Sequence, residues 1–371
     1  MNKRLFAAFI LTLLLSTSLF FTSCGDDDDN DDSNDNETDD DNDDNDDNGE
    51  AYAVIDADNA SQVQLLQELS GHTGGIYTLG WSPDGAYLAT AGADRDIRVW
   101  DAIAWTATVL TGHTGSVWGV SWSPDGARLA SVDLDGNFYL WDIASAALNQ
   151  NLTLEESAAY AVAWSLDGDT IAVGRIDGWI SLFDVESGSF TDEFASNTTG
   201  GLSTEIISLR FSPDGATLAS GGINYAIVLW NTANWEQLAE IRADTTARND
   251  INGLAWSNDG QLLAAAGQDS YLRLWNTSTY TETLRMKHGD SWTRGIAWSL
   301  GNDVLVATGE IFPVDLFDAQ SGAVLAQLTG HTSPVWAVDL SPDGRLVATG
   351  GGLYESTGGD TIVRIWGVPQ N

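Results

Sequence analysis

The sequence predicts an all-β protein built from seven copies of one small antiparallel sheet. The string Trp-Ser-Pro-Asp-Gly stands at residues 81–85 and again at 122–126, each time ahead of an apolar run that ends in Trp-Asp. The residue before this turn recurs at steps of 41, 42, 47, 45, 42 and 42 positions, and the residue that ends each unit recurs at steps of 41, 42, 47, 45, 42 and 49. Two independent anchors with matching steps indicate a true internal repeat of seven units.

Both anchors are mostly aromatic. The residues before the turn are Trp81, Trp122, Trp164, Phe211, Trp256, Trp298 and Leu340. The residues that end the units are Trp100, Trp141, Phe183, Trp230, Trp275, Phe317 and Trp366.

Each unit is expected to consist of short strands joined by tight turns. In the second unit, VWGVSW (117–122) alternates and is rich in β-formers, and Ser-Pro-Asp-Gly follows as a turn in which Pro fixes φ and Gly completes the reversal. ARLASV (127–132), a second turn containing Asp, and NFYLWD (137–142) complete the pattern. Strands of about six residues between frequent turns are typical of an all-β array.

A unit of about 40–45 residues with Gly-His near one end and Trp-Asp at the other resembles the WD40 repeat, whose blades form a β-propeller. The resemblance covers roughly residues 62–371 and implies a seven-bladed WD40-type β-propeller. A chain of 371 residues is longer than one simple core usually supports. Radial repetition removes that difficulty because each sheet buries its faces against its neighbours.

The resemblance also implies a hydrogen-bonded structural tetrad in three blades. In this family it joins the His of Gly-His, a Ser or Thr of the second strand, an Asp of the second turn and the Trp of the third strand. Its members here are His72, Thr90, Asp94 and Trp100 in blade one; His113, Ser131, Asp135 and Trp141 in blade two; and His331, Thr349, Asp360 and Trp366 in blade seven.

The other four blades depart from this pattern. None has a Gly-His pair, blades three and six end in Phe183 and Phe317, and blade four has Asn224 in place of the Asp. These blades are expected to depend more on apolar packing, and His288 receives no role. A catalytic interpretation of the His, Ser/Thr and Asp is rejected, because the set recurs in equivalent places with a Trp attached, which suits a scaffold.

The ring is expected to close through an amino-terminal strand. The last unit ends at Trp366 and no residues remain for an outermost strand, whereas SQVQLLQELSGH (61–72) alternates like a strand at 63–69. In this family the amino-terminal segment supplies the outer strand of the last blade. Residues 63–69 are therefore predicted to pair with the strand containing Ile362 to Trp366, which removes an unpaired edge and brings blades seven, one and two together. The propeller is placed at 61–371, with 61–69 as its closing strand.

Residues 1–23 are interpreted as a signal peptide. A basic start at Lys3 and Arg4 is followed by an uncharged stretch of seventeen residues and then by Ser23-Cys24-Gly25. This segment resembles the bacterial lipoprotein signal, which implies a lipidated (palmitate-type) amino terminus at Cys24, the chain's single cysteine. The alternative is a retained membrane anchor, for which seventeen residues is a short span.

Residues 24–60 are expected to be a lipidated Cys followed by a flexible acidic linker. Residues 26–50 hold sixteen acids, no bases and no apolar side chain, so nothing offsets the entropy of ordering them. Calcium binding by this run stays open, although it lacks a spaced Asp-x-Asp-x-Asp-Gly pattern. The formal net charge is −39, and residues 51–371 alone carry 38 acids against 13 bases. Such a surface repels nucleic acid.

A partner is expected on the narrow face of the propeller. The residue after the first apolar residue of each innermost strand points onto that face, and these residues are Tyr77, Trp118, Tyr160, Ile207, Asn252, Arg294 and Trp336. Aromatic residues and Arg are the usual anchors of binding hot spots, so Tyr77, Trp118, Tyr160, Asn252, Arg294 and Trp336 form the candidate partner-binding set. The plain alternative is that these rings only pack on one another in the channel mouth.

The sequence favours a noncatalytic, monomeric binding scaffold for a protein or peptide partner on the outer side of a bacterial membrane. No metal-ligand cluster, cofactor motif or phosphate-binding loop is found in it. Two alternatives stay open: a structural subunit of an envelope assembly complex, and a propeller hydrolase or lyase that uses the central channel. The identity of the partner and the membrane that carries the anchor are not encoded in any motif.

Overall fold

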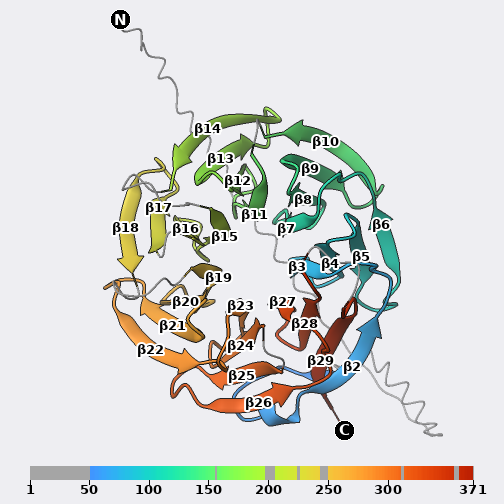
Figure 1. Cartoon of the computed structure of the whole chain (residues 1–371), viewed down its shortest axis with the longest axis vertical. Coiled ribbons are helices and arrows are strands. Elements are labelled where there is room, and N and C mark those ends of the chain that lie inside the picture. The colour runs from blue at the N-terminus through green and yellow to red at the C-terminus, as the bar shows by residue number, and fades with distance from the viewer. Residues whose placement is uncertain are drawn as a thin grey trace, which may run out of the picture. The chain divides into compact units, whose positions relative to one another are not determined.

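The protein is a ring of seven antiparallel sheets, as Figure 1 shows. The computed structural model describes residues 51–154, 157–196, 205–223, 226–242, 250–310, 313–354 and 359–370. Six sheets have four strands and the seventh has five. The prediction of an all-β, seven-bladed propeller is confirmed. The signal peptide, Cys24, the acidic run and Asn224 lie outside the described residues.

Blades one to six take their four strands in chain order from the channel outward, and blade seven takes its first three strands in the same way. The innermost strands are β3 (Ile76–Trp81), β7 (Val117–Trp122), β11 (Ala159–Trp164), β15 (Ile206–Phe211), β19 (Ile251–Trp256), β23 (Thr293–Trp298) and β27 (Val335–Leu340). The second strands are β4 (Tyr87–Gly92), β8 (Arg128–Asp133), β12 (Thr170–Arg175), β16 (Thr217–Gly222), β20 (Leu262–Gly267), β24 (Val304–Gly309) and β28 (Leu346–Gly351).

The two outer positions complete each sheet. The third strands are β5 (Ile97–Asp101), β9 (Asn137–Asp142), β13 (Trp179–Asp184), β17 (Ala226–Asn231), β21 (Tyr271–Asn276), β25 (Val314–Asp318) and β29 (Val363–Pro369). The outermost strands are β6 (Ala107–Leu110), β10 (Ala147–Thr153), β14 (Ser189–Ala195), β18 (Gln237–Arg242), β22 (Glu282–Lys287), β26 (Val324–Leu328) and, in blade seven, β2 (Gln64–Leu69).

The Ser-Pro-Asp-Gly turn connects the first two strands of a blade. The Ser82 hydroxyl donates to Asp84 Oδ1 at 2.6 Å and accepts from the Tyr87 amide at 2.9 Å. Gly85 has a φ of 72°, a conformation that side chains rarely tolerate. The same contacts recur in the turns that begin at Ser123, Ser212 and Ser341. The motif therefore recurs because every blade needs the same reversal.

Neighbouring blades share their apolar faces. Between blades seven and one, for example, Ile76, Leu88 and Trp100 pack with Ala348 and Ile365 in one buried cluster. Adjacent innermost strands are in contact around the whole circle, including β27 with β3. No blade is thick enough to bury its own faces, so the stability of each depends on both neighbours.

The predicted closure is confirmed. β2 pairs antiparallel with β29, from Gln64 opposite Gly367 to Leu69 opposite Val363. The side chain of Arg364 on β29 also lies 3.0 Å from Glu68 on β2 and 2.6 Å from Asp360. The closing strand is therefore attached both by its backbone and by a charged contact with the tetrad of blade seven.

The predicted boundary between linker and propeller at residues 60 and 61 is wrong. Residues Tyr52–Ala53 form β1, which pairs with Val368 and Pro369 of β29, and a short 3-10 helix, η1 (Ala60–Gln62), leads into β2. Ile55 is fully buried in the cluster formed by blades six and seven, and the Ala57 amide donates to Asp303 at 2.8 Å. The propeller therefore includes residues 51–60, because their apolar side chains have a place in its core. Among the residues that the structure describes, no helix is long and apolar enough to span a membrane.

Candidate functional site

The innermost strands all run in the same direction, so one end of the channel is formed by their first residues. We call this end the upper face; it is the face on which a partner is expected. A cavity of about 490 Å³ opens there. Five residues of the candidate set line it, namely Trp118, Tyr160, Asn252, Arg294 and Trp336, together with Ile207 from the same position of the repeat. The repeat positions chosen from the sequence are therefore brought together from six blades.

Tyr77 differs from the rest of the set because it is buried beneath them. Only 6% of it is exposed, and its ring stacks on Trp118 with centroids 4.4 Å apart. Trp118 meets Tyr160 edge-on at 5.0 Å and Trp336 at 5.7 Å. Packing between the rings therefore accounts for Tyr77, whereas Trp118, Tyr160 and Trp336 keep part of their surface open to the cavity.

Arg294 is held rigidly at the edge of this cluster. Its guanidinium lies 4.0 Å from the ring centroid of Trp336 and 4.9 Å from that of Trp292, and it pairs with Glu310 at 2.6 Å. Cation–π contacts on two sides and a carboxylate leave this side chain little freedom. A rigid Arg between aromatic rings loses little conformational entropy when a partner binds.

Two polar groups in the wall of the cavity lack a hydrogen-bond partner among the described residues. They are the indole N–H of Trp118 and the amide oxygen of Asn252, whose Nδ2 donates to the Thr293 carbonyl at 2.7 Å. An unpaired buried polar group costs about 1–3 kcal/mol. Both groups lie in the wall of the cavity, where water or a bound molecule satisfies such groups at lower cost.

Loops add residues that sequence reasoning missed. Trp292, Leu353 and Tyr354 line the cavity and are 42%, 45% and 53% exposed. The ring of Tyr354 lies 5.7 Å from Trp118 and 6.1 Å from Trp336. These three residues are recognised by their exposure in the structure, and exposure does not follow from a position in the repeat. Large exposed apolar side chains gathered at one site mark interaction surfaces.

The tetrads of blades one and seven have the expected hydrogen bonds. His72 contacts Asp94 through Nδ1 at 2.8 Å and Thr90 through Nε2 at 2.8 Å, and the Trp100 indole donates to Thr90 at 2.8 Å. In blade seven the corresponding contacts among His331, Asp360, Thr349 and Trp366 measure 2.8–2.9 Å. In both tetrads the Asp carboxylate can only accept a hydrogen bond, so the histidine must carry its proton on Nδ1.

The tetrad predicted for blade two is wrong in one member. His113 Nδ1 contacts Asp133 at 2.8 Å, not Asp135, while Ser131 and Trp141 take their predicted places. Asp133 is fully buried at the end of β8, whereas Asp135 is exposed and accepts from the Thr114 hydroxyl at 2.7 Å. Burial alone would raise the pKa of Asp133, but hydrogen bonds from His113 and Asn137 lower it to about 2.

The remaining blades replace the tetrad in different ways. In blade three, Phe183 packs against Phe138 at 4.8 Å. In blade five the Trp275 indole has no partner among the described residues, because Ala265 stands where a hydroxyl is needed. In blade six, His288 is 2% exposed and its Nε2 lies 3.6 Å from Asp315.

His288 is therefore a buried residue ahead of blade six, although no role was expected for it, and it lies near Asp315 of β25 through Nε2 without making the contacts of a tetrad. Its burial lowers the pKa of the imidazole against the pull of Asp315. The loop between His288 and β23 is one residue longer than the loop between His72 and β3.

In a comparison with known proteins, the family model "WD domain, G-beta repeat" matches more than half of the chain. The matched residues are 63–101, 105–142, 196–231, 235–276 and 322–367. The chief unmatched segments, 143–195 and 277–321, contain the blades that end in Phe183 and Phe317.

Individual relatives share shorter stretches. The chain is 38% identical over 48 residues to mouse "WD repeat-containing protein 1" and 43% identical over 53 residues to the "Probable cytosolic iron-sulfur protein assembly protein Ciao1" of Anopheles gambiae, in each case 13% of this chain. It is 26% identical over 180 residues, or 47% of this chain, to Arabidopsis thaliana "Protein FIZZY-RELATED 3". The aligned regions span 8%, 16% and 35% of those proteins. The seven radial sheets and the family match together establish that the chain belongs to the WD40 repeat family, whose propellers typically serve as protein-interaction scaffolds.

Proposed function

We propose that this protein is a noncatalytic binding platform that holds a protein or peptide partner on its upper face. The observation that carries the proposal is the aromatic cavity, in which Trp292 and Trp336 flank a fixed Arg294, and Trp118 and Tyr354 form part of the wall. Trp, Tyr and Arg dominate the energy of protein interfaces because each desolvates a large surface at low entropic cost. The charged groups lining this cavity are Glu205, Arg294 and Glu310, so it carries one net negative charge and favours a partner that is neutral or weakly basic.

Replacing Trp118 and Trp336 together with Ala is expected to abolish recovery of the partner after crosslinking in cells. Each ring is partly exposed in the cavity, and a hot-spot aromatic contributes about 2 kcal/mol or more to binding. Because these rings also pack on their neighbours, the exposed Trp292→Ala serves as a gentler variant, expected to reduce recovery at least tenfold with an unchanged melting temperature.

Tyr280→Ala provides the matched control for this experiment. Tyr280 is 40% exposed, similar to Trp292, but lies in the turn between the third and outermost strands of blade five. It is expected to recover the partner as the parent does. Equal recovery by Trp292→Ala, by the double variant and by Tyr280→Ala contradicts binding at the upper face.

We further propose that Cys24 carries lipid and that the acidic run 26–50 is a tether holding the propeller on the outer side of a bacterial membrane. The basic start, the apolar stretch and the position of the cysteine support this proposal. Acyl chains stabilise membrane attachment by about 0.8 kcal/mol per buried methylene, so several chains anchor a protein durably.

Mass spectrometry of the mature amino-terminal peptide is expected to find Cys24 as the first residue, with acyl chains attached. Cys24→Ser is expected to move the protein from the membrane fraction to the soluble or uncleaved precursor pool. A mature protein with an unmodified Cys24 sinks the proposal, and it does so without bearing on the upper face.

A further inference from the structure

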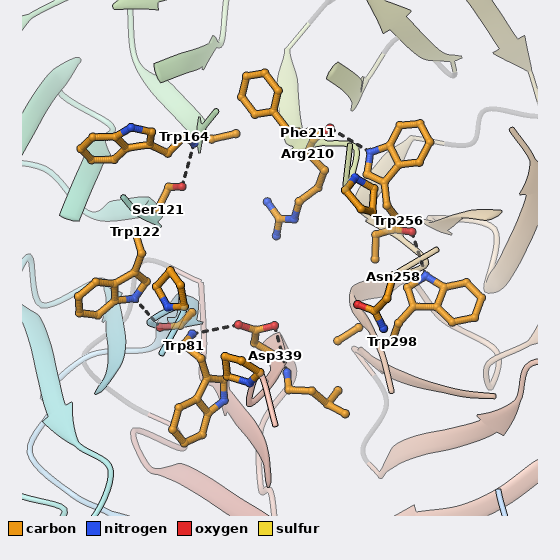
Figure 2. A pocket seen from close by; sticks show the side chains of 18 of the residues that line it. Trp81, Ser121, Trp122, Trp164, Arg210, Phe211, Trp256, Asn258, Trp298 and Asp339 are labelled. Atoms are coloured by element: carbon orange, nitrogen blue, oxygen red, sulfur yellow. Dashed lines mark hydrogen bonds between the residues drawn. The ribbon is translucent and has the colours of Figure 1, made fainter. Parts of the chain in front are cut away.

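The lower end of the channel, where the innermost strands finish, contains a second cavity of about 460 Å³. The fifth residue of each innermost strand lies in its wall, and these residues are Gly80, Ser121, Ala163, Arg210, Ala255, Ala297 and Asp339. Five of the seven are Gly, Ala or Ser, which keeps the channel open at this level. The two exceptions carry opposite charges, and Figure 2 shows both side chains directed into the cavity.

The wall next to these residues is aromatic and fixed in place. Trp81, Trp122, Trp164, Phe211, Trp256 and Trp298 are the sixth residues of their strands and line the cavity. The Trp122 indole donates to the Gly80 carbonyl at 2.9 Å, and those of Trp256 and Trp298 donate to Arg210 and Ala255 carbonyls at 3.0 Å. Each of these bonds ties one blade to the blade before it, so the cavity is preformed.

Arg210 makes no ion pair with any residue that the structure describes. Its Nη1 donates to the carbonyl of its neighbour Leu209 at 2.9 Å, and the rest of the guanidinium faces the channel. This is unusual in a propeller region with 38 acids and 13 bases, where carboxylates are abundant. The side chain is exposed to the channel, and a guanidinium open in this way pairs readily with an anionic ligand.

Asp339 is the single acidic side chain in this wall. Its carboxylate accepts the Trp81 amide of blade one and the Leu340 amide, both at 3.0 Å, which hold it in one orientation. Blades four and seven are as far apart as two blades of a seven-membered ring can be, so Arg210 and Asp339 face each other across the channel without a direct contact (Figure 2). A space with a cation on one side and an anion on the other matches a ligand that carries both charges.

We propose that this cavity binds a small zwitterion, an apolar amino acid or dipeptide, with its carboxylate on Arg210, its ammonium group on Asp339 and its apolar side chain on the tryptophan wall. The volume is within the range of small-molecule sites, and such sites combine apolar walls with a few oriented polar groups. The site is at the opposite end of the channel from the upper face, so it is independent of the proposed partner.

The test is calorimetric titration of the full mature chain with leucine, phenylalanine and leucyl-leucine. At least one of these probes is expected to bind. Its amide lacks the carboxylate and its N-acetyl derivative lacks the ammonium charge. Each derivative is expected to bind at least about tenfold more weakly than the free probe. Arg210→Gln is expected to remove the preference for the acid over the amide, and Asp339→Asn the preference for the free amine over the acetylated form.

Two features keep this test decisive. The Arg210 side chain is exposed, and its one hydrogen bond among the described residues goes to the carbonyl of the neighbouring Leu209, so Arg210→Gln is expected to fold as the parent does. Arg175→Gln, which removes a cation elsewhere, is expected to bind as the parent does. If none of the three probes gives a heat of binding at concentrations up to about 10 mM, the proposal is overturned, because even a millimolar dissociation constant would be detected at that concentration. Parent-like affinity of Arg210→Gln for the zwitterion, or equal affinity of the parent for the capped forms, also overturns it.

Discussion

Deletion of residues 51–69 is expected to lower the melting temperature by more than about 10 °C. It removes β1, η1 and β2, so β29 becomes an unpaired edge and the ring loses its closure. It also removes Ile55 and Leu69, which are 0% and 3% exposed. Each such side chain contributes about 1.5–3 kcal/mol of burial, before the loss of strand hydrogen bonds is counted. About 1 kcal/mol corresponds to roughly 2–4 °C in a protein of this size class.

A deletion of equal length supplies the control. Removing residues 26–44, which are acidic or polar throughout, shortens the chain by the same nineteen residues without touching the closing segment. Calorimetry is expected to find its melting temperature within about 2 °C of the parent. If the 51–69 deletion also melts there, the closing strand does not hold the ring and this account of the fold fails.

A narrower variant separates the two parts of the closing segment. Ile55→Asp leaves β2 intact but places a charge in the cluster between blades six and seven. The melting temperature of Ile55→Asp is expected to lie clearly below that of the parent but above that of the 51–69 deletion.

The spacing of the anchors predicted the number of blades because a blade cannot bury its faces alone, which forces a periodic sequence. The same reasoning predicted β2, since the strand count of the last blade was incomplete. The contribution of residues 51–60 to the core could not be predicted from the sequence pattern. Their burial comes from Ile55 and Ala60 and from contacts with blades six and seven that no local pattern encodes.

The upper face shows a similar division. Trp118, Tyr160, Arg294 and Trp336 occupy a fixed position of the repeat, so their convergence followed from the strand pattern. Trp292, Leu353 and Tyr354 come from loops outside the repeat, and no strand pattern describes where such residues lie.

Blade two shows where position alone misleads. Asp135 stands four residues after Ser131, as Asp94 stands four after Thr90, and so alignment selects it. Blade one has Gly92 two residues after its Thr, whereas blade two has Asp133, whose side chain reaches His113 first. The nearer carboxylate takes the buried site, and Asp135 is left at the surface.

Replacing Asp133 with Ala is expected to destabilise the protein by roughly 3–5 kcal/mol, and Asp135→Ala by less than about 0.5 kcal/mol. The Asp133 carboxylate accepts from His113 at 2.8 Å, from the Asn137 side chain at 2.9 Å and from the backbone amides of Asp135 and Asn137 at 3.0 and 2.9 Å. Its loss leaves the buried His113 ring and these partly buried donors without their acceptor. Urea titration of the two variants measures the difference directly, and equal midpoints for them contradict the revised tetrad.

The pH dependence gives this assignment a second readout. The pKa of Asp133 is about 2 in the folded protein and has an ordinary value of 3.8, so the unfolded chain binds its proton first as the pH falls. The resulting stabilisation, about 2 kcal/mol, is present above pH 4 and is lost between about pH 4 and pH 2. Asp133→Asn lacks this titration, so its deficit relative to the parent is expected to shrink by about 2 kcal/mol across that interval. A deficit of Asp133→Asn that stays constant across this interval would contradict Asp133 as the buried carboxylate of blade two.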